Sequence, residues 1–230
     1  MSAPRVGMLH TVPLLADDFE QLVAGAAPGI EVVHAADPSL LARAREGGVT
    51  ADVEEDVARH LARLRDAGAS AILVTCSSIG GAVDRAAGSL DLPVLRVDRP
   101  MAIEAVRIAA AASGRVAVLA TLAATLDPTS ELIRVEAERV GAAVTVTSTV
   151  IDGAFDARSR GDDAAHDRAV RRAAATAAGT GDVIVLAQAS MARAIGGEDL
   201  AVPVLTSPAS GAAALVDVLS TIGVPPRAEP

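Results

Sequence analysis

An internal repeat of about half the chain is the feature that most constrains the fold. The segment RVGMLHT at residues 5–11 resembles RVAVLAT at residues 115–121, and LPVL at 92–95 resembles VPVL at 202–205. Between these two matches, ILVTC at 72–76 aligns with IVLAQ at 184–188. The period is longer than that of solenoid repeats. The repeat therefore predicts two similar halves.

Each half alternates short β-branched runs with Ala-rich amphipathic stretches, the βαβ pattern of a parallel sheet covered by helices on both faces. We predict an α/β fold with two pseudo-symmetric lobes, each a four-stranded parallel sheet flanked by helices. The first lobe is expected to span residues 1–98 plus 207–230, and the second 99–206. The predicted strands are Arg5–Leu9, Glu31–His34, Ala71–Thr75, Val94–Val97, Arg115–Ala120, Val144–Val150, Val183–Ala187 and Val202–Thr206.

Two helices are signalled clearly. The segment 52–67 has Thr50 as a candidate N-cap and Gly68 as its stop, with an apolar stripe of Val53, Val57, Leu61 and Leu64. A second helix is predicted to begin at Asp127-Pro128, a capping acid before a proline, and to end at Gly141.

Composition excludes several classes of function. The 230-residue chain has a net charge of -9 and 1% aromatic residues, so neither a basic surface nor a stacking platform for nucleic acid is expected. It contains no lysine, which excludes a pyridoxal phosphate Schiff base and a P-loop lysine. A secretory signal and an apolar run of roughly 20 residues are absent. We therefore expect a soluble cytoplasmic protein that uses no cofactor and binds no membrane.

The single cysteine, Cys76, stands in ILVTCSSIGG, between a predicted buried strand and a predicted helix. A helix N-terminus, together with the hydroxyls of Ser77 and Ser78, can lower the pKa of a thiol from roughly 8.5. The alternative is an inert small residue that fills a core. Ligands of parallel α/β sheets bind at the carboxyl ends of the strands, so Cys76 and Gln188 are expected to be counterparts across one cleft between the lobes.

His10 ends the first predicted strand and is followed by Thr11. It could relay a proton, or bind a substrate carboxylate as imidazolium, or simply face water at a strand end. The remaining histidines, His34, His60 and His166, lack the spacing of metal ligands and are interpreted as surface residues, so no metal site is predicted.

Hydroxyls and amides recur at the other strand-to-helix turns, where they could bind a carboxylate or cap helices. Asp98 is a further polar candidate, or a partner for Arg99. The candidate substrate-binding residues are Thr11, Ser77, Ser78, Thr121, Thr125, Gln188, Ala189, Ser190 and Ser207.

The strand order, the repeat, and the motifs TCSS (75–78) and LAQASM (186–191) resemble the aspartate/glutamate racemase superfamily, which includes hydantoin racemases, maleate isomerases and arylmalonate decarboxylases. The resemblance implies two lobes around an active-site cleft, cofactor-independent chemistry on a small carboxylate, and a homo-oligomer, commonly a dimer. In the racemases of this superfamily each of the two turns carries a cysteine. This chain keeps the first as Cys76 and has Gln188 at the second.

Glutamine neither removes nor returns a proton near neutral pH, so a two-thiol racemase is disfavoured. One thiol can still add to an alkene diacid, protonate an enolate left by decarboxylation, or epimerise an acidic carbon. The expected function is therefore an isomerase, racemase or lyase in which Cys76 and His10 are catalytic and Gln188 donates to a substrate oxygen. The alternative is a non-catalytic two-lobed protein that binds or senses a metabolite.

Overall fold

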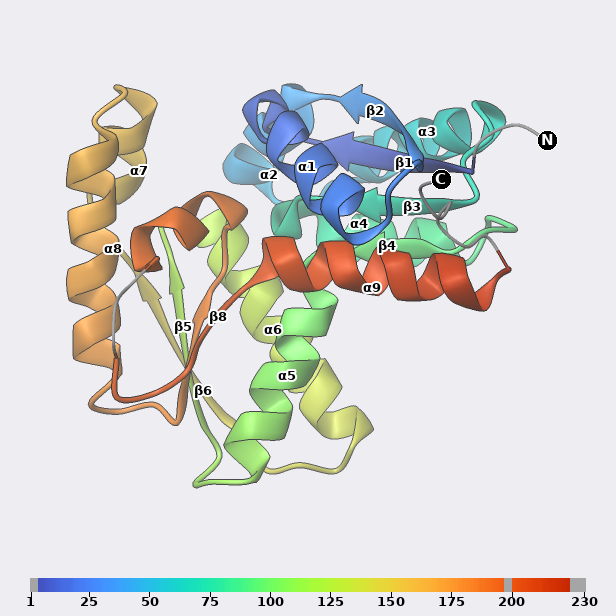
Figure 1. The fold of residues 1–230 in the computed structure, drawn as a ribbon. Helices are drawn as coiled ribbons and strands as arrows, with labels where there is room; N and C mark the ends of the chain where they lie inside the picture. Colours follow the sequence, from blue (N-terminus) through green and yellow to red (C-terminus); the bar gives the residue numbers. More distant parts are fainter. Residues whose placement is uncertain (1–3, 197–199, 224–230) are drawn as a thin grey trace. The chain divides into compact units, whose positions relative to one another are not determined.

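The computed structural model describes residues 4–196 and 200–223 (Figure 1). Contacts within the chain divide it into two compact units, residues 1–97 with 208–230 and residues 98–207. Each unit contains one four-stranded parallel sheet, ordered β2-β1-β3-β4 in the first and β6-β5-β7-β8 in the second. The two orders are the same under the sequence repeat, so the predicted α/β fold with two similar lobes is confirmed.

In the first unit, β1 (Arg5–His10) and β3 (Ala71–Val74) are the central strands, with β2 (Glu31–Ala36) and β4 (Val94–Arg96) at the edges. Almost every residue of β1 and β3 is buried. Such unbroken apolar runs, without alternation, are typical of strands covered on both faces.

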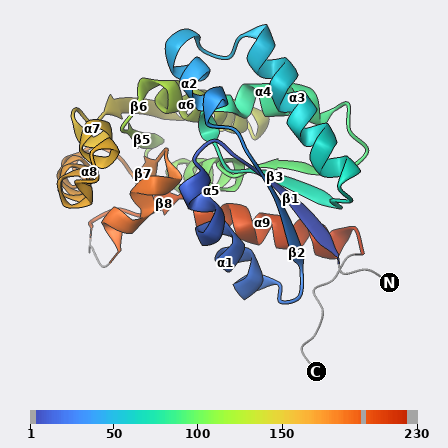
Figure 2. The same cartoon turned by 90° about the horizontal axis from the view of Figure 1, so that it is seen from above.

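Helices cover both faces of this sheet (Figure 2). On one face α2 (Pro38–Gly47), α3 (Ala51–Asp66) and α4 (Gly80–Ala87) pack on Leu9, Ile72 and Val74. The other helices of the unit are α1 (Ala16–Ala26), which follows a short 3-10 helix, Pro13–Leu15, and α9 (Ser207–Thr221).

The α3 helix confirms the sequence pattern, because all four residues of its predicted stripe are buried. Its N-cap is Thr50, as predicted, but the expected capping bond is absent. The Thr50 hydroxyl instead donates to Asp52 Oδ1 at 2.5 Å, since a carboxylate in the first turn is the stronger acceptor.

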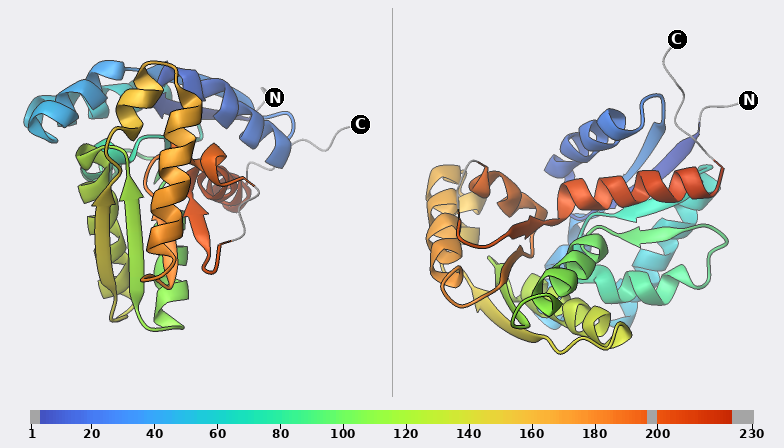
Figure 3. Two further views of the ribbon diagram at one scale, coloured as in Figure 1. Left: turned by 90° about the vertical axis from the view of Figure 1, so that its left-hand side faces the viewer. Right: turned by 60° about the horizontal axis from the view of Figure 1, so that its bottom comes forward.

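In the second unit, β5 (Arg115–Ala120) and β7 (Val183–Leu186) are central, with β6 (Thr145–Val150) and β8 (Val204–Thr206) at the edges. One face packs on α5 (Arg99–Ala110) and α6 (Ala123–Arg139). The other packs on α7 (Ala154–Ser159), α8 (Asp163–Ala177) and the 3-10 helix η3 (Ala189–Ile195) (Figure 3).

The predicted start of α6 at Asp127-Pro128 is wrong. The helix begins at Ala123, four residues earlier, and Pro128 lies inside it. Proline there removes one intrahelical hydrogen bond. The earlier turn forms nonetheless because Leu126 is buried in the core and its backbone N–H bonds to the Leu122 carbonyl.

Within the described ranges, no helix combines the length and the apolar character needed to cross a membrane.

Candidate functional site

The carboxyl ends of β1 and β3 meet in the first unit. These strands are paired in parallel up to Leu9 and Val74. His10 is the last residue of β1 and is followed by Thr11, while Thr75 and Cys76 follow β3. The parallel register thus brings the two predicted catalytic residues to the same edge of the sheet.

Cys76 is half-buried and immediately precedes a 3-10 helix, η2 (Ser77–Ile79). Burial raises the pKa of its thiol, and this effect outweighs the hydroxyl of Thr11, the hydroxyl and backbone N–H of Ser78, and the backbone N–H of Ile79, all of which lower it. The expectation of a thiol pKa below its ordinary value is therefore wrong. A single 3-10 turn follows the cysteine where the sequence predicted a helix start, and its N–H groups do not offset the loss of solvent.

Among the groups that lower the pKa of the thiol, the side chain of Thr11 has the largest effect. Its side chain is buried, and it is near enough to lower the pKa of Cys76. Its Oγ1 nevertheless makes no hydrogen bond of ordinary geometry with any residue that the structure describes. This hydroxyl, beside the sulfur, is a donor available to a ligand or to a thiolate. Ser77 and Ser78 are both buried in η2, and Ser78 is the one whose groups act on the thiol.

His10 is fully buried, so it does not face water at the strand end. Its Nδ1 lies 3.0 Å from Thr75 Oγ1, and its Nε2 lies 2.9 Å from Nδ1 of His34 on β2. Burial, and then the neighbouring His34, lower the pKa of His10 to about 4. Near neutral pH His10 is therefore an uncharged imidazole with both nitrogens engaged, which does not support the expected carboxylate contact by imidazolium.

The second unit repeats the arrangement with different chemistry. Gln188 follows β7 as Cys76 follows β3, and Thr121 follows β5 as Thr11 follows β1. Gln188 Oε1 accepts from the Thr121 backbone N–H at 2.5 Å and from its hydroxyl at 3.0 Å. Because only the amide oxygen can accept from a backbone N–H, the Nε2 group of Gln188 is left as a hydrogen-bond donor.

The other predicted site residues lie at separate positions. Thr125 is buried in the first turn of α6, Ala189 and Ser190 are partly exposed in η3, and Ser207 is buried at the start of α9. Asp98 is fully buried at the N-cap of α5, while Arg99 pairs with Glu136 of α6.

The interpretation of His166 as a surface residue is wrong. It is fully buried on α8, and its Nδ1 lies 2.9 Å from Asp167 Oδ1. His166, Val170 and Ala174 are spaced by four residues and are the buried residues of α8, which is a signal that the sequence contained. Asp167 also pairs with Arg193 and so ties α8 to η3, the segment that follows Gln188.

Sequence reasoning missed three members of the network around His10: Thr75, His34 and Glu20, whose Oε2 lies 3.3 Å from His34 Nε2. No set of three or more His, Cys, Asp and Glu side chains suited to a metal ion occurs in residues 4–196 and 200–223.

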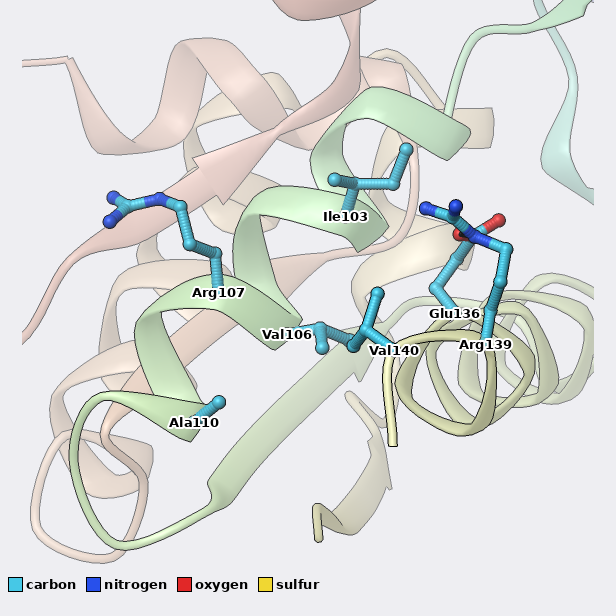
Figure 4. A pocket seen from close by; sticks show the side chains of 7 residues that line it. All are labelled: Ile103, Val106, Arg107, Ala110, Glu136, Arg139 and Val140. Atoms are coloured by element: carbon cyan, nitrogen blue, oxygen red, sulfur yellow. Dashed lines mark hydrogen bonds and ion pairs between the residues drawn. The ribbon is translucent and has the colours of Figure 1, made fainter. Parts of the chain in front are cut away.

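A groove of about 300 Å³ lies elsewhere, between α5 and α6 of the second unit (Figure 4). Apolar side chains of Ile103, Val106, Ala110 and Val140 line it beside the ion pair of Glu136 with Arg139. It contains none of the predicted site residues.

The protein is therefore a two-lobed α/β protein with polar groups at equivalent strand ends: Thr11 and Cys76 in the first unit, and Thr121 and Gln188 in the second. A family model described as Asp/Glu/Hydantoin racemase matches residues 10–215, and the chain belongs to this family.

Solved structures have the same fold. Glutamate racemase from Bacillus anthracis is 17% identical with a TM-score of 0.73, covering 96% of this chain and 83% of that one. Allantoin racemase from Pseudomonas fluorescens is 17% identical with a TM-score of 0.63, covering 97% and 93%. A Gly-to-Cys mutant of arylmalonate decarboxylase is 21% identical with a TM-score of 0.61, covering 99% and 97%. A search of curated proteins gave no match.

Proposed function

We propose that the protein is a cofactor-independent enzyme of the racemase, isomerase and lyase type, acting on a small carboxylate through one thiol, that of Cys76. The observation that carries the proposal is the pair of equivalent turns. One holds a half-buried thiol surrounded by donors, and the other holds Gln188, whose amide has no acid–base function near neutral pH. A reaction that needs two opposed thiols is therefore not proposed.

The raised pKa of Cys76 favours one of the three single-thiol reactions. Addition to an alkene and epimerisation by one base both start from a thiolate, which burial disfavours at rest. Protonation of an enolate starts from the thiol itself. We therefore infer that Cys76 acts as a proton donor, as in the decarboxylation of a malonate-type diacid.

The steps balance with water as the one further reactant, which gives a proton and leaves hydroxide. The bond from the α-carbon to one carboxylate breaks, carbon dioxide leaves, and the electron pair remains as an enolate on the other carboxylate. Cys76 Sγ–H then gives its proton to the α-carbon. The resulting thiolate accepts hydrogen bonds from Thr11, Ser78 and the Ile79 N–H until it takes a proton from water.

The test is turnover of a panel of malonate-type diacids, amino acids and hydantoins in deuterium oxide. The proposal predicts carbon dioxide release from a diacid with one deuteron placed on the α-carbon. Exchange of an α-proton without release of carbon dioxide would favour a racemase. Thermal stabilisation by an acid of the panel, without any turnover, would favour the metabolite-binding alternative.

A further inference from the structure

A chain of four side chains runs through the first unit from the protein surface to the residue before Cys76. Glu20 of α1 contacts His34 of β2 at 3.3 Å, His34 contacts His10 of β1 at 2.9 Å, and His10 contacts Thr75 at 3.0 Å. Glu20 is largely exposed, whereas His10 is fully buried. The proposed reaction uses none of these contacts.

The possible proton positions along this chain are few. A carboxylate only accepts, so His34 Nε2 must carry a hydrogen to bond Glu20. If His34 is neutral, its Nδ1 is then an acceptor, and His10 must donate to it from Nε2. His10 Nδ1 in turn accepts from the Thr75 hydroxyl. All four imidazole nitrogens and the Thr75 hydroxyl have a partner in this arrangement.

One additional proton reverses the inner half of the chain. A protonated His34 donates from both nitrogens, so His10 Nε2 becomes an acceptor and its hydrogen moves to Nδ1. His10 then donates to Thr75 Oγ1, and the Thr75 hydroxyl turns to its second acceptor, the Leu9 carbonyl at 3.2 Å. Thr75 thus has a partner for its hydrogen in both states.

The outer histidine is the one that solvent can reach. The His34 side chain is 27% exposed and faces a carboxylate, whereas His10 is buried and carries a pKa of about 4. Glu20 and His10 are the titratable groups that contact His34 within the described residues. Helix α3 also packs on β2, but its histidine, His60, bonds to Asp37.

We propose that Glu20 and His34 are positioning residues for the turn that follows β3, Thr75 and Cys76. Through the tautomer of His10, they set the orientation of the Thr75 hydroxyl, one residue before Cys76, according to whether His34 carries a proton. The proton arrangement is independent of the proposed function, and its consequence for catalysis rests on that function.

The arrangement is tested on the intact protein by ¹⁵N NMR of its four imidazoles, which distinguishes the two tautomers. We expect the His10 hydrogen on Nε2 at about pH 8 and on Nδ1 at about pH 5, two values chosen because histidine side chains as a class change charge between them. His34→Gln, which does not titrate, should leave a single His10 tautomer at both pH values. The matched control His60→Gln removes a histidine–carboxylate bond in the same unit and should retain the change. An unchanged His10 tautomer in the native protein would overturn the proposal.

The consequence for catalysis is measured separately. On an acid that the native protein turns over, His34→Gln should lower kcat three-fold or more with KM unchanged, while His60→Gln keeps both. A tautomer change in the NMR spectra combined with an unaltered kcat in His34→Gln would refute the positioning role without touching the role of Cys76. If the native protein turned over none of the acids, this result would count against the proposed function and leave the proton arrangement unaffected.

Discussion

Substitution of His10 should remove a specific part of the dependence of folding stability on pH. The pKa of His10 is about 4 in the folded protein, against an ordinary value near 6.5 in an unfolded chain. Between these values the unfolded state binds a proton that the folded state does not, so stability falls as the pH falls through this window. The total loss is about 3 kcal/mol by pH 4, and about 2 kcal/mol of it is reached between pH 7 and pH 5.

The assay is urea unfolding of the native protein and His10→Gln at pH 7 and pH 5. Far-ultraviolet circular dichroism is the suitable signal, because the chain contains no Trp or Tyr. Carboxylates contribute equally to both proteins, so the difference isolates His10. Thr75→Val, which keeps the imidazole and loses its hydroxyl partner, is the matched control and should retain the native pH dependence. Equal loss of stability in the native protein and His10→Gln would refute a buried, neutral His10.

Further expected outcomes concern the thiol, the amide and one turn. Iodoacetamide should alkylate Cys76 several-fold more slowly than free cysteine at about pH 7, because burial raises the pKa of the thiol. The two rates should become equal only at higher pH, and rapid labelling well below about pH 8 would contradict this. Gln188→Leu should destabilise the protein by about 1–3 kcal/mol in urea unfolding, since the buried Thr121 N–H loses its acceptor, and an unchanged midpoint would argue against that bond. Gly114→Ala should cost more than about 2 kcal/mol by the same method, because φ is +80° and the new Cβ would lie 2.6 Å from the Ala143 carbonyl oxygen; native stability would disprove this geometry.

The fold was accessible from the sequence because its signals are local and repeated. Continuous apolar runs mark the central strands of both sheets, and the second half reproduces the strand order of the first. The start of α6 was missed because the burial of Leu126, a tertiary effect, overrides the local Asp127-Pro128 signal.

Only the positions of the site residues at the edge of the sheet could be predicted from the sequence. The carboxyl ends of β1 and β3 follow from the βαβ pattern, so Cys76 and Thr11 could be placed at one edge of a sheet. The direction in which the Cys76 pKa is shifted could not be predicted, because it depends on how much solvent the folded chain removes from the sulfur. His34 was interpreted as a surface residue, and its contact with His10 was not predicted because it arises from the register of β2 on β1, where His34 lies opposite Met8.

The central claim is that the Cys76 thiol gives its proton to substrate. The most direct measurement compares the native protein, Cys76→Ser and Cys76→Ala for turnover and deuterium incorporation on an acid that the native protein converts. A serine hydroxyl is far less acidic than a thiol, so the account predicts that both variants lose nearly all turnover while their circular dichroism spectra and binding of the acid are retained. Full turnover with normal deuterium incorporation in Cys76→Ser would contradict it.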